Sequence, residues 1–373
     1  MEGNRCRNRR LVSEIRSDDL TGRAFAGSCV DEGDGVSSVL TEHLSGPSAW
    51  RGRDLQGSTE WIYTVSQQAL DELDGALAHA RSSGRPLEQL QKSDFPLPTF
   101  AADLSAIAAE LEQGRGFVQM KGLDVDRYGA ENAAIVYWGI GLHLGIALSQ
   151  NARGELLGHV RDEGLDVNDT AVRGYQTNAD QSFHTDIGGD VVGLMCVNTA
   201  KSGGRSRVVS SIAIHNELLA RYPWYLGLLY NGFDIDWRGE EPEGAAPTYR
   251  EPIFSYHEQR LSCRFAPRFI KSACSKTGIP LSAPAQEAIA IVEELAEELC
   301  FEIPFERGDV QLINNYVMLH ARTGYVDHAD LARRRHLLRL WLKVPGARSL
   351  PPEYGGGRAG SGVPVRRQAR ASS

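Results

Sequence analysis

Three residues of this sequence have the types and spacing that could hold a divalent metal ion. His184 and Asp186 are separated by one residue, and side chains at positions i and i+2 of a strand point to the same face. His320 lies far downstream, after an apolar segment, and can supply a third ligand from a distant strand. Two histidines and a carboxylate on one face leave three coordination positions open. This is the facial triad of non-haem iron(II) oxygenases.

Two further motifs raise this interpretation above the simpler one, in which a His-x-Asp pair is part of an exposed strand. Residues 203–206 (GGRS) follow the pair, and residues 334–339 (RRHLLR) follow the distal histidine. Arg335 and Arg339 are four residues apart and share a face of the expected strand. Because arginine is seldom buried among leucines without an anion, these side chains suggest a carboxylate-binding site. A salt bridge to a nearby acid such as Asp327 is the alternative.

The order and spacing of these elements resemble the taurine/2-oxoglutarate dioxygenase family, the TauD/TfdA group, over about residues 115–345. The resemblance implies that His184, Asp186 and His320 bind iron(II), and that 2-oxoglutarate and O₂ are consumed. It also implies that Arg335 binds the distal carboxylate of 2-oxoglutarate. Ser206 stands where the family usually has threonine and can donate the same hydrogen bond.

The resemblance also points to residues that contact the substrate. Arg339 matches a position where some members bind an acidic group of their substrate, and Arg322 follows the distal histidine by two residues. Gln181 and Phe183 flank the first histidine, although core packing is an equal alternative for Phe183. The spacing from the distal histidine to the expected clamp is longer than in the family's best-known members. Arg334 and Arg322 are therefore alternatives for the clamp.

The activity that the resemblance implies is Fe(II)- and 2-oxoglutarate-dependent oxidation of a small molecule. We expect hydroxylation of an anionic or amino-acid-derived metabolite, with succinate and CO₂ as co-products. Because Asp186 is a carboxylate, the sequence argues against the related halogenases, in which a small residue leaves room for halide. Desaturation, cyclisation or epimerisation on the same scaffold, a non-catalytic jelly-roll binding protein and a zinc enzyme are the alternatives.

The elements that would position these residues are mainly short strands. Between residues 153 and 344, β-prone runs alternate with glycine and proline, which predicts a sandwich or barrel. The resemblance implies a double-stranded β-helix (jelly-roll) core with flanking helices, a mainly β, α+β class. We predict strands at residues 116–121, 156–160, 191–198, 207–210, 233–237, 252–254, 260–265, 301–304, 310–313 and 336–344. Apolar periodicity and caps predict helices at residues 66–81, 102–113, 130–147, 212–221 and 284–300.

Three parts of the chain are expected from this pattern. Residues 1–114 form a partly ordered, helical N-terminal extension, residues 115–348 form the oxygenase domain, and residues 349–373 form a loose tail rich in glycine, proline and arginine.

Composition narrows the class of protein and its location. The chain has 373 residues, 42% of them hydrophobic and 24% charged, which suits a globular protein. The net charge of −8 gives no electrostatic reason to bind nucleic acid or an anionic membrane. The six cysteines form no C-x-x-C pair, and no apolar segment follows the basic residues 1–10. We therefore expect a cytoplasmic enzyme that acts on a small-molecule substrate. Both a monomer and a homo-oligomer are compatible with the sequence.

Overall fold

The computed structural model describes residues 38–166, 172–352, 354–356 and 361–365. The described residues belong to one compact unit that begins at Ser37. Much of the expected N-terminal extension, residues 1–37, therefore lies outside the described part. The helices are α1 Gln67–Ser82, α2 Phe100–Gln113, α3 Val125–Leu144, α4 Ser211–Arg221, α5 Leu226–Asn231, α6 Pro267–Thr277 and α7 Ala283–Leu299. In the part of the chain described, no helix has the length and apolar character needed to cross a bilayer.

Seven strands form the larger sheet, in the order β1-β2-β14-β6-β17-β3, with β4 also paired to β17. A second sheet has the order β13-β8-β15-β5, and three two-stranded ribbons complete the strands. The bounds are β1 Ile62–Thr64, β2 Phe117–Lys121, β3 Ile146–Ala147, β4 Leu157–Val160, β5 Gln181–His184, β6 Val191–Asn198, β7 Ser202–Gly203, β8 Ser206–Ser210, β9 Phe233–Asp236, β10 Thr248–Glu251, β11 Phe254–His257, β12 Arg260–Cys263, β13 Phe301–Ile303, β14 Val310–Asn314, β15 Met318–Arg322, β16 Tyr325–Val326 and β17 His336–Lys343. This mixed architecture, with helices around a jelly-roll core, is the expected fold class.

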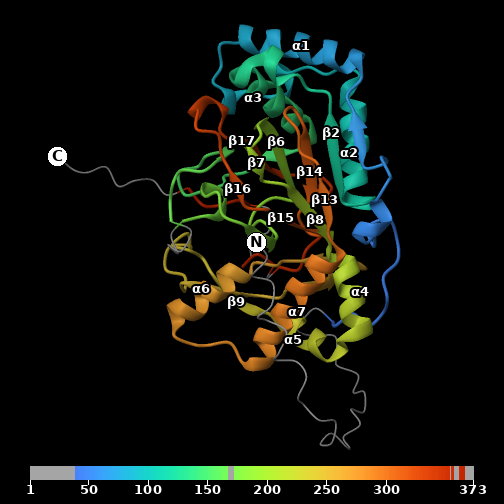
Figure 1. The fold of residues 1–373 in the computed structure, drawn as a ribbon, viewed down its shortest axis with the longest axis vertical. Helices are drawn as coiled ribbons and strands as arrows, with labels where there is room; N and C mark the ends of the chain where they lie inside the picture. The colour runs from blue at the N-terminus through green and yellow to red at the C-terminus, as the bar shows by residue number, and fades with distance from the viewer. Residues whose placement is uncertain (1–37, 167–171, 353, 357–360, 366–373) are drawn as a thin grey trace, which may run out of the picture. The chain divides into compact units, whose positions relative to one another are not determined.

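Helices α1, α2 and α3 pack on the larger sheet (Figure 1). Their apolar stripes share one core with Met195 of β6, Leu312 of β14 and Leu338 of β17. Ser66 caps α1 by accepting a hydrogen bond from the backbone N–H of Ala69, as its sequence position predicts. This helical layer buries one face of the larger sheet.

The smaller sheet positions the candidate ligands through its alternation. Leu319 and Ala321 of β15 enter a second hydrophobic core with α4, α5, α6 and α7. Because neighbouring side chains of a strand point to opposite faces, His320 and Arg322 point away from that core. One strand therefore supplies both packing and polar side chains for the site.

The structure confirms the strongly periodic elements and adds several that the sequence pattern did not reveal. All five predicted helices are present, although α3 begins earlier because Asp124 caps it. His320 follows β14, which matches the predicted strand at residues 310–313, and it lies within β15, a strand that was not predicted separately. Helices α5 and α6 and strand β1 were not predicted. Strand β1 pairs in parallel with β2, which joins the described part of the N-terminal segment to the larger sheet.

Part of the C-terminal segment packs on the larger sheet. The side chains of Tyr354 and Val363 are 1% and 4% exposed. The backbone N–H of Val363 donates to the carbonyl of Ser149, and its side chain contacts the cluster around Trp341. These contacts tie residues after 349 to the wall behind the site.

Candidate metal centre

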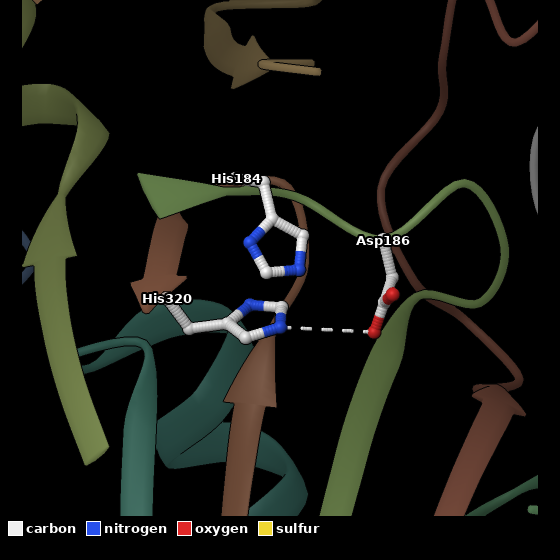
Figure 2. A group of neighbouring side chains, drawn as sticks. All are labelled: His184, Asp186 and His320. Atoms are coloured by element: carbon white, nitrogen blue, oxygen red, sulfur yellow. Dashed lines mark ion pairs between the residues drawn. The ribbon is translucent and has the colours of Figure 1, made fainter. Parts of the chain in front are cut away.

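His184, Asp186 and His320 converge at the end of β5 (Figure 2). Strand β15 runs antiparallel to β5 with His320 opposite His184, and their ring centroids are 4.3 Å apart. Asp186 follows β5 by two residues. One ligand atom from each side chain lies within 4.8 Å of the other two. The pairing of two strands thus unites residues that are far apart in the sequence.

The protonation states of the two histidines allow their rings to bind a metal cation. His184 Nδ1 donates to the carbonyl of Ser182 at 2.9 Å, which leaves its Nε2 lone pair free to ligate a metal. The side-chain Nε2 of Gln181 lies 3.0 Å from His184 Nε2, and a metal ion bound to that histidine would replace this contact. Burial, followed by the nearby His184, lowers the pKa of His320 to about 3, so its ring is neutral.

His320 Nε2 lies 3.8 Å from Asp186 Oδ2. Because the imidazole is neutral, this contact is no ordinary ion pair, and the Nδ1 of the same ring has no hydrogen-bond partner in the described structure. Two imidazole nitrogens and a carboxylate oxygen that converge in this way are the donor set of an iron(II) facial triad. The residues present therefore fit the metal that the sequence implies.

Two side chains of β17 hold the carboxylate of Asp186. Trp341 Nε1 donates to Oδ2 at 3.0 Å, and Arg339 Nη1 lies 3.4 Å from Oδ1. Burial raises the pKa of Asp186, but the charge of Arg339, with the hydrogen bond from Trp341, opposes this effect, and the pKa lies below its ordinary value. The carboxylate is thus ionised, as a metal ligand must be. A salt bridge to an acid was the alternative role for the two arginines of this segment. Arg339 forms such a salt bridge, and its partner is Asp186.

Replacing Trp341 by phenylalanine tests this support. The ring would remain under Arg339, whose guanidinium carbon lies 4.7 Å from the indole centroid, but the N–H donor to Asp186 would be lost. We expect about tenfold weaker Fe(II) binding in anaerobic calorimetry, within the range known for partners of metal ligands. Trp224→Phe is the matched control, because Trp224 is 67% exposed. Unchanged affinity in W341F would show that the donor is dispensable.

Asn315 fixes the main chain around the aspartate. Its Oδ1 accepts from the backbone N–H of Asp186 at 2.9 Å, and its Nδ2 donates to the carbonyls of Asp186, Gly188 and Gly189. Asn315 thus supports the metal ligand Asp186 through hydrogen bonds to the main chain. Arg264, which the sequence reasoning missed, also donates to the carbonyl of Asp186 and pairs with the buried Glu251.

An inner cavity opens on one side of the triad. Ser206, Arg322 and Arg335 line it together with His184 and His320. Arg335 is 5% exposed, and its Nη1 has no hydrogen-bond partner in the described structure. Asp327 accepts from the backbone N–H of Arg335, and the described residues place no carboxylate within ion-pair distance of its guanidinium.

The Nη1 donor of Arg335 is therefore suited to bind an anion, since a buried donor without a partner is costly. Burial also lowers the pKa of Arg335. Ser206 Oγ donates to Gln311 Oε1 at 2.8 Å and lies on the wall of the same cavity. Arg334, the neighbouring alternative for the clamp, is exposed and lines no cavity of this site.

A second cavity, here called the outer cavity, adjoins the first at His184 and includes Asp186 in its wall. Its wall includes Gln181 and Trp341 and four arginines, Arg173, Arg238, Arg268 and Arg339. The first three arginines come from loops or the start of a helix and had no periodic signal in the sequence. Gln181 and Arg339 line both cavities and so lie where the two meet.

Phe183 does not contribute to either cavity. Its side chain is 2% exposed and packs in the core with α7, and Arg207 lies 5.1 Å from its ring. The assignment of Phe183 to substrate binding was wrong because it alternates with His184 along β5 and therefore points to the opposite face. The packing alternative is correct.

A protein family model matches the part of the chain that contains all residues of the site. The model described as "Taurine catabolism dioxygenase TauD, TfdA family" matches residues 83–341. The chain belongs to the TauD/TfdA family. Members are Fe(II)- and 2-oxoglutarate-dependent oxygenases, so this protein is an enzyme that uses iron and 2-oxoglutarate.

Two TauD/TfdA-like sequences show how far the similarity extends. The chain is 34% identical over 319 residues to FR-33289 synthase of Streptomyces rubellomurinus (strain ATCC 31215), an alignment that covers 84% of this chain and 94% of that protein. It is 29% identical over 329 residues to the taurine hydroxylase-like protein SAT17 of Stachybotrys chartarum (strain CBS 109288 / IBT 7711), which covers 82% and 83%.

Solved structures share the TauD/TfdA fold at low identity. Asparagine oxygenase, solved with Fe(II), 3-hydroxyasparagine and succinate, aligns with a TM-score of 0.59 at 16% identity and covers 76% of this chain and 94% of its own. The non-haem iron oxygenase OrfP, solved with Fe and alpha-ketoglutaric acid, aligns with a TM-score of 0.58 at 14% identity and covers 76% and 93%. These structures support the fold.

Proposed function

We propose that this TauD/TfdA enzyme hydroxylates a small anionic metabolite at the junction of the two cavities, releasing succinate and CO₂. Fe(II) would be held by His184, Asp186 and His320. The observation that carries the proposal is that His184 lines both cavities. One cavity contains a buried arginine whose Nη1 has no partner in the described structure, and the other has an arginine-rich wall. A co-substrate and a substrate can therefore approach one metal from two directions.

Different residues of the chain bind the co-substrate, lie next to the substrate and orient the metal ligand. Arg335 binds the far carboxylate of 2-oxoglutarate, and the hydroxyl of Ser206 would turn from Gln311 Oε1 to donate a second hydrogen bond to that carboxylate. Gln181 and Arg339 lie between co-substrate and substrate, and Trp341 keeps the Asp186 carboxylate oriented. Bound iron supplies the activation of O₂, while the protein orients the reactants and shields them from water.

The charge of the outer cavity supports an anionic substrate. Arg173 pairs with Glu240 and Arg339 with Asp186, while Asp236 is engaged by Lys276. Burial, then the positive charges of Arg173 and Arg268, lowers the pKa of Arg238 to about 10. Because the positive charges in this wall repel one another, a negatively charged ligand would bind favourably beside them.

An amino-acid-derived substrate is a narrower form of the same proposal. Asparagine oxygenase and OrfP were each solved with a hydroxylated amino acid, which supports hydroxylation on this fold. Desaturation, cyclisation or epimerisation would use the same residues and differ only in product. The cytoplasm is the proposed location.

Turnover with product analysis tests the proposal. Anionic metabolites would be screened for substrate-dependent succinate formation from 2-oxoglutarate with Fe(II) and O₂, with D186N as the inactive control. We expect at least one compound to gain a single oxygen atom for each succinate released. A loss of two hydrogens would assign desaturation in place of hydroxylation. No succinate with any substrate, and none without substrate, would contradict the proposed activity.

A further inference from the structure

We propose that Arg322 is a second arginine for the far carboxylate of 2-oxoglutarate, acting beside Arg335. This inference rests on the proposed function, because it concerns the same inner cavity. It reassigns Arg322, which sequence reasoning had linked to the substrate or offered as a replacement for the clamp. The co-substrate would thus be held by two guanidinium groups.

The register of the smaller sheet brings Arg322 to the inner cavity. On β15 it follows His320 by two residues and so shares its face, and across the sheet it pairs with Ser206 of β8. Arg322 lines the inner cavity with Ser206 and Arg335 but is not part of the outer cavity's wall. A ligand that contacts Ser206 and Arg335 is therefore within the same enclosure as Arg322.

The guanidinium of Arg322 is buried with donors that nothing in the described structure accepts. The residue is 6% exposed, and its Nε and Nη1 have no hydrogen-bond partner there. Its Nη2 donates to the carbonyl of Ala179. A buried cation with two unused donors is unfavourable unless an anion fills the space beside it.

One tyrosine links the two arginines. The guanidinium carbons of Arg322 and Arg335 lie 4.8 Å and 5.0 Å from the ring centroid of Tyr325. The two positively charged groups therefore lie against one ring and repel each other. A carboxylate offers about four acceptor sites and can bind both groups at once, which relieves that repulsion.

A comparison of two ligands measures this contact directly. Anaerobic calorimetry with Fe(II)-loaded protein would use 2-oxoglutarate and 2-oxobutyrate, which lacks the far carboxylate. For Arg322→Gln we expect 10- to 100-fold weaker binding of 2-oxoglutarate, the size of a charge-assisted hydrogen bond, and little change for 2-oxobutyrate. Arg334→Gln is the matched control, since this neighbour is exposed. An equal loss for both ligands would overturn the inference.

Thermal unfolding separates binding from a structural role. Without 2-oxoglutarate, Arg322→Gln should melt at or above the wild-type temperature, because it removes an uncompensated buried charge. With 2-oxoglutarate it should gain less stability than the wild type. A ligand-free variant that melts well below the wild type would assign Arg322 to the fold and overturn the inference.

The same experiment distinguishes this inference from the proposed function. If the wild type binds 2-oxoglutarate, Arg335→Gln loses that binding and Arg322→Gln keeps it, then only the inference fails. If the wild type does not bind 2-oxoglutarate, the proposed function itself fails.

Discussion

Asp186→Asn is expected to weaken Fe(II) binding by more than about 100-fold and to abolish substrate-dependent succinate formation, a larger loss than that of partners outside the coordination sphere. The substitution removes the only charged ligand of the proposed triad. An amide keeps the volume and retains an oxygen that can accept from Trp341, so the loop held by Asn315 should stay intact. Metal affinity would be measured by anaerobic calorimetry and folding by thermal unfolding.

A matched control for this variant is Asp234→Asn. Asp234 is a half-exposed carboxylate on β9 that lies 3.7 Å from Arg250, outside both cavities. It should bind Fe(II) as the wild type does. If D186N keeps wild-type affinity for Fe(II), Asp186 is not a ligand and the triad assignment is wrong.

Arg335→Ala should have the second largest effect, on the co-substrate. Removing one partner of a buried charge pair costs about 3–5 kcal/mol, so the dissociation constant of 2-oxoglutarate should rise by roughly 10²- to 10⁴-fold. Because Arg335 does not contact the triad, Fe(II) affinity should stay near the wild-type value. Binding would be followed by calorimetry and by the 2-oxoglutarate dependence of succinate formation.

Arg334→Ala is the control for this second prediction. Its side chain is exposed next to Arg335 in the sequence, so the variant carries the same change of charge without touching the inner cavity. An equal effect of both variants would mean that net charge, and not the buried guanidinium, governs binding. Wild-type binding in R335A would move the clamp to another residue.

Strand periodicity made much of the site predictable from local sequence. His184 ends β5 and Asp186 lies two residues beyond it, outside the strand, yet both side chains reach the same site. Arg335 was singled out because its surroundings are apolar. The same rule would have excluded Phe183, which alternates with His184 and points into the core. It would also have indicated Trp341, which shares the face of Arg339 on β17 and donates to Asp186.

Long-range pairing limited the rest of the prediction. That His320 faces His184 depends on the register between β15 and β5, which no local pattern encodes. The arginines of the outer cavity, Arg173, Arg238 and Arg268, come from segments without periodicity. The paired charges of Arg264 and Glu251 meet only after folding. Elements with strong amphipathic stripes, such as α1 and α7, were predictable because burial of one helical face is a local property.

The visible spectrum of the anaerobic protein tests the central claim most directly. Fe(II) and 2-oxoglutarate would be added to the wild type, D186N and R335A in the absence of oxygen. We predict a weak metal-to-ligand charge-transfer band in the wild type, no band in D186N, and in R335A a band that requires far more 2-oxoglutarate. A wild type without the band, or a band that persists unchanged in D186N, would contradict the account of this site.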